Sequence, residues 1–177
     1  SAYSVGSSDS FAIRQRIEGY NIADLAWGTV GAQTVTLSFW VRSSLTGNFG
    51  GVIINDNHDM NYPFSYNISS ANTWTKVSVI ITGPTTGTWN VSSGIGLQII
   101  WGLGVGSSVS TSSTGWLSGT SYVAPTGSVS VVGTSGATWY ITGVQLEVGT
   151  QATPFEFRHY TTELALCQRY YLKIKAT

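Results

Sequence analysis

The sequence predicts an all-β protein, an antiparallel β-sandwich of the jelly-roll type with a short C-terminal extension that forms a helix or a strand. Apolar and polar residues alternate in several segments, as in strands that bury one face. Clusters of Gly, Pro and Asn separate these segments and indicate turns. Gly, Ser and Thr supply more than a third of the 177 residues, and 12% are aromatic. This composition favours a neutral β protein with a well-filled core.

The first two strands are expected near the N-terminus. One covers residues 11–18, and Asn21 is expected to cap a short helical turn after it. The clearest strand of the chain covers residues 34–42, where strict alternation separates an apolar face from a polar one. Trp40 and Arg42 lie on the polar face, so they are expected to point away from the core.

Four more strands follow from the same alternation, at residues 62–68, 74–82, 95–103 and 139–147. Trp101 and Trp139 fall at buried positions of this pattern. The side chains predicted to lie between the two sheets are Val35, Leu37, Phe39, Val41, Val77, Val79 and Ile81.

The remaining segments are expected to be loops and one helix. Residues 104–138 are rich in Gly, Ser and Thr, which predicts long loops with one or two weak strands. Thr161 or Thr162 is expected to cap a brief helix over residues 163–166. We therefore expect a sandwich domain at 1–158 and an extension at 159–177, the start of a further segment of a parent protein.

Charge is scarce and balanced, with eight basic and eight acidic side chains. A nucleic-acid surface needs clustered Lys and Arg, so nucleic-acid binding is not expected. No apolar run is long enough to cross a membrane, and no membrane partner is expected. The single cysteine, Cys167, excludes an internal disulfide and is expected to be a packed thiol.

Catalysis is not expected from this chain. Residues 77–146 contain no Asp, Glu, Lys, Arg or His, so acid–base chemistry would have to come from the two ends of the sequence. Neither of the two histidines lies in a nucleophile or zinc motif. We therefore expect a protein that is not an enzyme.

The loop at residues 55–61 places oxygen-bearing side chains at alternate positions, which suits Ca²⁺. It lacks the Gly and the distal Glu of an EF-hand. The favoured interpretation is a turn in which Asn and Asp bond their own backbone.

Aromatic side chains beside amides and a few charges are typical of sugar-binding sites, because sugars offer apolar faces and hydroxyl edges. Core packing is the competing interpretation for each tryptophan. The candidate glycan-binding residues are Trp40, Arg42, Asp56, Asn57, Asp59, Tyr62, Trp116 and Tyr122.

Several segments resemble bacteriophage tail and tail-fibre proteins. They are residues 11–22, 36–43, 72–74, 86–89 and, most specifically, 140–156 with 163–171, including Cys167-Gln-Arg-Tyr-Tyr. The family is similar to jelly-roll carbohydrate-binding modules, which commonly hold a structural Ca²⁺ between the first and last strands. By this resemblance, Glu18 and Glu147 would be the matching acids.

The resemblance implies a virion location in the phage tail, after synthesis in the bacterial cytoplasm. The expected function is non-catalytic binding of host surface polysaccharide. The alternatives are a structural module that contacts other virion subunits, and an accessory domain of a polysaccharide depolymerase. Tail fibres are commonly trimers, and the apolar residues Leu164, Leu166, Tyr170, Tyr171, Leu172 and Ile174 need cover. A homotrimer and docking on the chain's own sandwich are both open.

Overall fold

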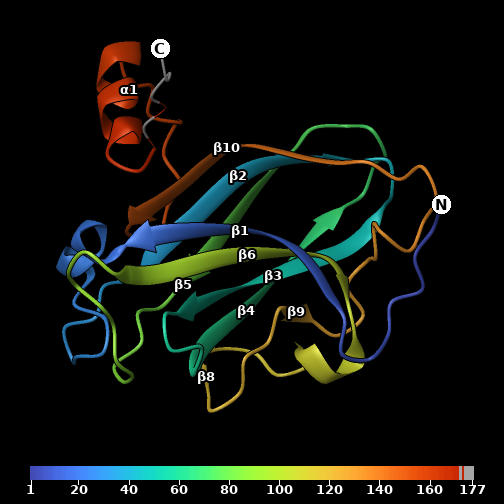
Figure 1. Cartoon of the computed structure of the whole chain (residues 1–177), viewed down its shortest axis with the longest axis horizontal. Coiled ribbons are helices and arrows are strands. Elements are labelled where there is room, and N and C mark those ends of the chain that lie inside the picture. The colour runs from blue at the N-terminus through green and yellow to red at the C-terminus, as the bar shows by residue number, and fades with distance from the viewer. Residues whose placement is uncertain (172, 174–177) are drawn as a thin grey trace.

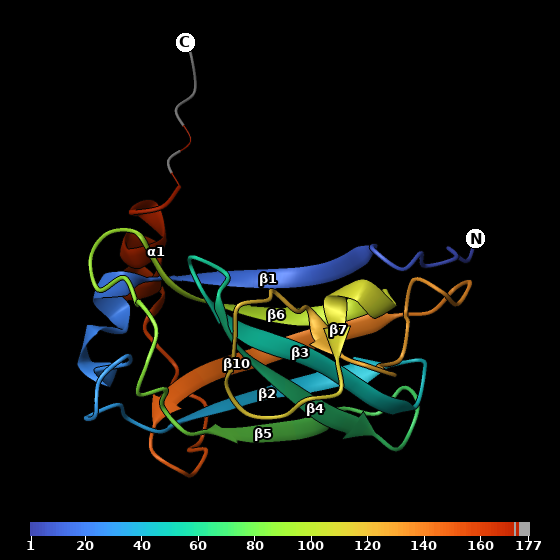
Figure 2. The same cartoon turned by 90° about the horizontal axis from the view of Figure 1, so that it is seen from below.

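The computed structural model describes residues 1–171 and 173, and it is an antiparallel β-sandwich (Figures 1 and 2). One sheet has five strands in the order β1-β6-β3-β4-β8, and the other has three in the order β10-β2-β5. The bounds in the first sheet are β1 Ser10–Glu18, β6 Ile95–Val105, β3 Gly47–Asn55, β4 Met60–Ile68 and β8 Leu117–Ser118; in the second they are β10 Trp139–Val148, β2 Val35–Ser43 and β5 Thr75–Ile81. The predicted fold class is confirmed.

The core lies between the two sheets and follows the predicted register. All seven residues predicted between the sheets face inward; six are buried and Val79 is half-buried. Phe39 is the central example, since its ring packs edge-on against Tyr66 of β4 and Trp101 of β6. Trp40, one residue along, is 41% exposed on the outside of the three-stranded sheet.

Strand β10 contains a β-bulge that keeps its outward residues on one face. The pairing with β2 is regular up to Thr142, opposite Trp40, and resumes at Gln145, opposite Ser38. Gly143 lies at this irregularity with a positive φ of 58°, a conformation that glycine adopts without a steric penalty. As a result, Tyr140 and Thr142 before the bulge, and Gln145 after it, all face outward.

Strand β3 was not predicted, because its sequence does not alternate. Phe49 and Ile53 enter the main core, whereas Val52 and Ile54 form a second buried cluster with Ile100 on the opposite face of the sheet. A strand buried on both faces has no polar side, so the two-residue period is lost. Residues 46–48 form one of the clusters with Gly and Asn that indicate turns in the sequence, but Gly47 and Asn48 are the first two residues of this strand.

The helical predictions need correction. Residues 19–21 and 23–25 form two short 3-10 turns, and Asn21 is the last residue of the first instead of a cap. The C-terminal helix α1 covers Tyr160–Gln168 and begins earlier than expected. Its N-cap is His159, whose side chain accepts a hydrogen bond from the Thr161 backbone N–H.

The long 104–138 segment contains more short elements than expected. They are a 3-10 turn at Ser107–Val109 and the two-residue strands β7 Ser110–Thr111, β8 and β9 Ala124–Pro125. Strands β7 and β9 form a small parallel pair. Val129 and Val131 alternate in the sequence as in a weak strand, but they lie in a loop, where their backbone N–H groups donate to the carbonyl oxygens of Asn48 and Leu103.

Helix α1 stands beside the sandwich near the C-terminal ends of β1 and β10, and the N-terminus lies at the opposite end (Figure 1). Its side chains are exposed, including Leu164, Leu166 and Cys167, so the expectation of a packed thiol was wrong. Of the predicted apolar run, Leu172 and Ile174 lie outside the described residues. Within the described part of the chain, no helix has the length and apolar character that a bilayer crossing requires.

The neighbours Phe39 and Trp40 test the register of β2. Replacing Phe39 with Ala should lower the free energy of unfolding by about 3–5 kcal/mol, because it empties a fully buried site. Replacing Trp40 with Ala should cost about 1 kcal/mol or less, since its ring lies outside the core and is 41% exposed. Chemical denaturation of the two variants measures both values, and a larger loss for Trp40→Ala would mean that the faces are assigned the wrong way round.

Candidate ligand-binding site

The outer surface of the three-stranded sheet carries an open group of aromatic and cationic side chains. Tyr140 of β10 lies opposite Arg42 of β2, and Lys76 of β5 lies opposite Trp40. Trp74 directly precedes β5, and alternation places it on the same side as Lys76. Trp40, Trp74 and Tyr140 are 41%, 43% and 49% exposed. These five residues are called the aromatic face below.

Arg42 is held in place on this face. Its guanidinium carbon lies 5.8 Å from the centre of the Tyr140 ring, a cation–π contact. Its Nε is buried and has no hydrogen-bond partner among the described residues. Within the same residues, neither Arg42 nor Lys76 has a carboxylate within ion-pair distance. The charge of Arg42 is therefore oriented without being neutralised.

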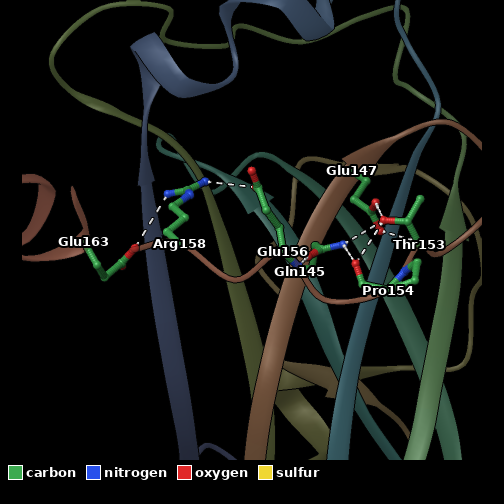
Figure 3. A network of polar contacts seen from close by, with 7 residues as sticks. All are labelled: Gln145, Glu147, Thr153, Pro154, Glu156, Arg158 and Glu163. Atoms are coloured by element: carbon green, nitrogen blue, oxygen red, sulfur yellow. Dashed lines mark hydrogen bonds and ion pairs between the residues drawn. The ribbon is translucent and has the colours of Figure 1, made fainter. Parts of the chain in front are cut away.

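The chain after β10, residues 149–159, folds back and covers the other half of this sheet (Figure 3). These residues are called the return segment below. Glu147 accepts hydrogen bonds from the Thr153 backbone N–H, at 3.1 Å, and from the Thr153 hydroxyl. Gln145 accepts a bond from the Glu156 backbone N–H at 2.8 Å. The bond from the Thr153 hydroxyl is the main reason that the pKa of Glu147 is lowered.

Phe155 brings this return segment to the border of the aromatic face. A Cβ atom added to Gly143 would lie 3.4 Å from the Trp40 ring and 3.8 Å from the Phe155 ring, so the two rings flank this glycine. The return segment thus forms a wall along one side of an otherwise open surface, and Phe155 contributes a partly exposed ring to it.

Trp116 and Tyr62, two of the candidate glycan-binding residues, both contribute to the edge of the core. The Trp116 ring packs edge-on against Trp27, Trp89 and Tyr62, with centroids 5.3–5.4 Å apart. Its indole N–H donates to the Thr82 carbonyl oxygen at 2.6 Å. Trp116 was expected as an exposed platform in a polar loop, but it closes one end of the sandwich.

The 55–61 segment is the turn between β3 and β4, as the favoured interpretation predicted. Asn55 accepts from the backbone N–H groups of Asp59 and Met60, and its amide donates to the Asp59 carboxylate at 2.6 Å. Asp56, Asn57 and Asp59 are exposed there, at the end of two inner strands of the five-stranded sheet.

The long loop lies against this turn. The Gly119 N–H donates to the Asp59 carbonyl oxygen, and Asn61 donates to the Thr120 carbonyl oxygen at 2.6 Å. Tyr122 follows in the same loop and is half-buried. The eight sequence candidates are therefore spread over different parts of the sandwich, and of them only Trp40 and Arg42 lie on the aromatic face.

Glu18 and Glu147, the acids that the resemblance assigns to Ca²⁺, have protein partners. Glu18 accepts from Arg169 at 2.6 Å and from the Tyr170 hydroxyl at 2.7 Å, and these two bonds, Arg169 first, lower its pKa. The Glu147 carboxylate accepts two hydrogen bonds from Thr153. No group of three or more acidic, His or Cys side chains suited to a metal occurs in the described residues. This donor set does not fit a calcium site.

The Glu18 contacts fix helix α1 over a groove at the end of the sandwich. The groove has a volume of about 880 Å³ and lies between the ends of β1 and β10 on one side and Leu166, Cys167 and Tyr170 on the other. One carboxylate thus connects two segments that are 151 residues apart in sequence.

Sequence reasoning missed Tyr140 and Phe155 as members of the site. The signal for Tyr140 was present, since it alternates with Ile141, which faces the core. Phe155 lies outside any strand, and no periodicity marks it. Trp74 and Lys76 alternate at the start of the predicted strand 74–82, so the same signal was present for them, but they were not among the candidates.

Comparison of the chain with protein-family models, curated proteins and solved structures found no match. Its function must therefore be inferred from its own sequence and geometry.

Replacing Trp116 with Ala should lower the free energy of unfolding by about 3 kcal/mol, because it leaves a cavity among three aromatic rings. Trp74→Ala is the matched control, since that ring is exposed and its loss should cost about 1 kcal/mol or less. Thermal melts of both variants measure the difference. Equal melting temperatures would show that Trp116 is not part of the core.

The docking of α1 should depend on pH through Glu18. The pKa of Glu18 is lowered in the folded state. The stabilisation that Glu18 gives to the docked helix is therefore fully present above the ordinary glutamate pKa and is lost as the pH falls through the lowered value. A dye on Cys167, the single cysteine, should show high anisotropy from neutral pH down to about pH 5 and lower anisotropy in stronger acid. Glu18→Gln should show the lower anisotropy throughout; an unchanged profile in this variant would contradict the tether.

Proposed function

We propose that this chain is a non-catalytic carbohydrate-binding module and that the aromatic face is its binding surface. The observation that carries the proposal is the clustering of Trp40, Trp74 and Tyr140, all large and exposed, on one side of one sheet. Sugar rings stack on such rings through their apolar C–H faces, while neighbouring polar groups bind their hydroxyls. Thr142, exposed opposite Trp40, adds a hydroxyl to the same surface.

The shape of the surface favours an extended ligand. The face is open on a sheet and is bordered on one side by the return segment with Phe155. An open surface lets a long chain pass across it, whereas a closed pocket would select a chain end. Polysaccharide is therefore the ligand class that we propose, with individual sites in the range of about 0.1–1 mM.

The ionisable groups support a binding role without catalysis. A glycosidase needs a carboxylic acid whose pKa is raised so that it can donate a proton. The resolved carboxylate shifts, at Glu18 and Glu147, are both downward, and each acid is bonded to protein donors. The pKa values of these two acids are therefore shifted in the opposite direction from that of a catalytic acid.

The biological setting that we propose comes from the sequence resemblance to phage tail and tail-fibre proteins. In that setting, the bound polysaccharide is on the host surface and the module is part of the virion. Weak sites repeated on several subunits, as in a homotrimer, would give avidity without one tight site.

A second candidate function is virion assembly, and the exposed helix α1 favours it. Leu164, Leu166, Tyr170 and Tyr171 are 41–72% exposed. Apolar side chains gathered on a projecting element are typical of protein contacts. This function would place binding at α1 and leave the aromatic face without a ligand, so mutations separate the two.

Trp40→Ala and Trp74→Ala should each weaken binding of host-derived polysaccharide by about tenfold or more, because a stacking platform is lost. Tyr20→Ala, which removes an exposed ring outside the aromatic face, should bind like the unmodified chain. Isothermal titration gives the affinities, and thermal melts confirm that the folds are intact. Equal binding by all four proteins would exclude the aromatic face, and lack of binding by the unmodified chain would favour assembly.

A further inference from the structure

We propose that the ligand of the aromatic face is an acidic polysaccharide, in which a sugar stacked on Trp40 carries a carboxylate that Arg42 and Lys76 bind. This inference rests on the proposed function and names its substrate class. It comes from the placement of two cations around one exposed indole ring, in a chain where charged residues are only 9% of the sequence.

The register of the sheet puts both cations within reach of the same sugar. Lys76 is directly opposite Trp40 on β5, and directly opposite residues of antiparallel strands have Cβ atoms about 5 Å apart. Arg42 is two residues along β2 on the same face, a rise of about 7 Å. A sugar on the indole ring therefore lies between a guanidinium and an ammonium group.

The two cations have no counter-charge of their own, unlike two other arginines of the chain. Arg169 contacts Glu18, and Arg158 lies 3.6 Å from Glu156 and 3.9 Å from Glu163. Within the part of the chain that the structure describes, Arg42 and Lys76 have no such ion pair. An anion bound here would gain charge-assisted hydrogen bonds without first breaking an existing ion pair.

Arg42 is also preorganised for this role. The Tyr140 ring supports its guanidinium group, and its Nε is buried, so a ligand meets the terminal Nη groups. A carboxylate accepts hydrogen bonds from both Nη groups, one to each oxygen, which fixes the orientation of the sugar. A neutral hydroxyl has a single oxygen and cannot form this paired geometry.

Glu147, an acidic group on the same sheet face, lies away from Arg42. It is opposite Thr36, at the other end of the face from Arg42, and Thr153 bonds its carboxylate. Lys76 contributes only a minor part of the lowering of the Glu147 pKa. The open half of the face is therefore positive, and the negative group lies under the return segment.

The experiment uses two uronates, polymannuronate and polygalacturonate, each compared with its own neutral form in which C6 has been chemically reduced, a mannan and a galactan of the same linkage. At low salt, the chain should bind at least one uronate about tenfold more tightly than its neutral partner, and salt should reduce this preference. Arg42→Gln should remove most of the preference, and Lys76→Gln should reduce it. Arg16→Gln is the control, because it removes an exposed cation from β1 in the other sheet.

The outcomes separate this inference from the proposed function. Equal binding of neutral and acidic partners that Trp40→Ala weakens would overturn the acidic preference and leave the carbohydrate-binding function in place. No binding of any of the four polysaccharides would count against both. An equal loss in Arg16→Gln, or tighter binding of single-stranded DNA than of either uronate, would show unspecific attraction of anions and overturn the inference. Thermal melts of Arg42→Gln and Lys76→Gln confirm folding, and either variant suffices for the test.

Discussion

The packing of the Phe39 ring between Tyr66 and Trp101 is the contact that sets the orientation of β2 and of the aromatic face on its outer side. Its ring centroid is 5.2 Å from that of Tyr66 and 5.8 Å from that of Trp101, so one side chain of β2 touches two strands of the opposite sheet. Because side chains alternate along a strand, burying Phe39 directs Trp40 into solvent. The direction of Trp40 and Arg42 is thus a consequence of core packing.

Alternation made the sandwich and the outward direction of Trp40 and Arg42 on the aromatic face predictable. The segment 34–42 has one face that is apolar throughout, and the structure buries that face. Where both faces are buried the signal disappears, as in β3, and the strand could not be seen in the sequence. The start of α1 was predicted at Thr161 or Thr162, because hydroxyl side chains are common N-caps. His159 is the N-cap instead, since its ring nitrogen accepts a hydrogen bond as a hydroxyl oxygen would.

The site was predicted less well than the fold, because pairing between distant strands decides which side chains meet. Trp116 lies in a loop full of Gly, Ser and Thr, and nothing local shows that its ring reaches Trp27 and Trp89. Tyr140 joins Arg42 only because β10 pairs with β2 in one particular register. A single sequence carries no direct information about such long-range pairing.

The two candidate functions depend on different surfaces that share the return segment. Between β10 and α1, residues 149–159 first cover Gln145 and Glu147 and then lead to the helix. Arg158 joins the two parts, since its guanidinium lies between Glu156 in the segment and Glu163 in α1 (Figure 3). These exposed ion pairs contribute little energy individually, so the helix relies mainly on Glu18 for its position.

The bulge at Gly143 determines how the end of β10 can vary. Ile141 and Leu146 both face inward although an odd number of positions separates them, which is possible only because the bulge adds one residue to the strand. If the bulge were flattened while its residue stayed in the strand, strict alternation would turn Gln145 and Glu147 toward the core. The anchor of the return segment would then be buried, and apolar side chains would take its place on the surface. Deleting Gly143 together with the bulge would instead give a regular strand in which Gln145 and Glu147 still face outward opposite Ser38 and Thr36. The bulge and its extra residue can therefore be gained or lost only together if the faces of the strand are to be kept.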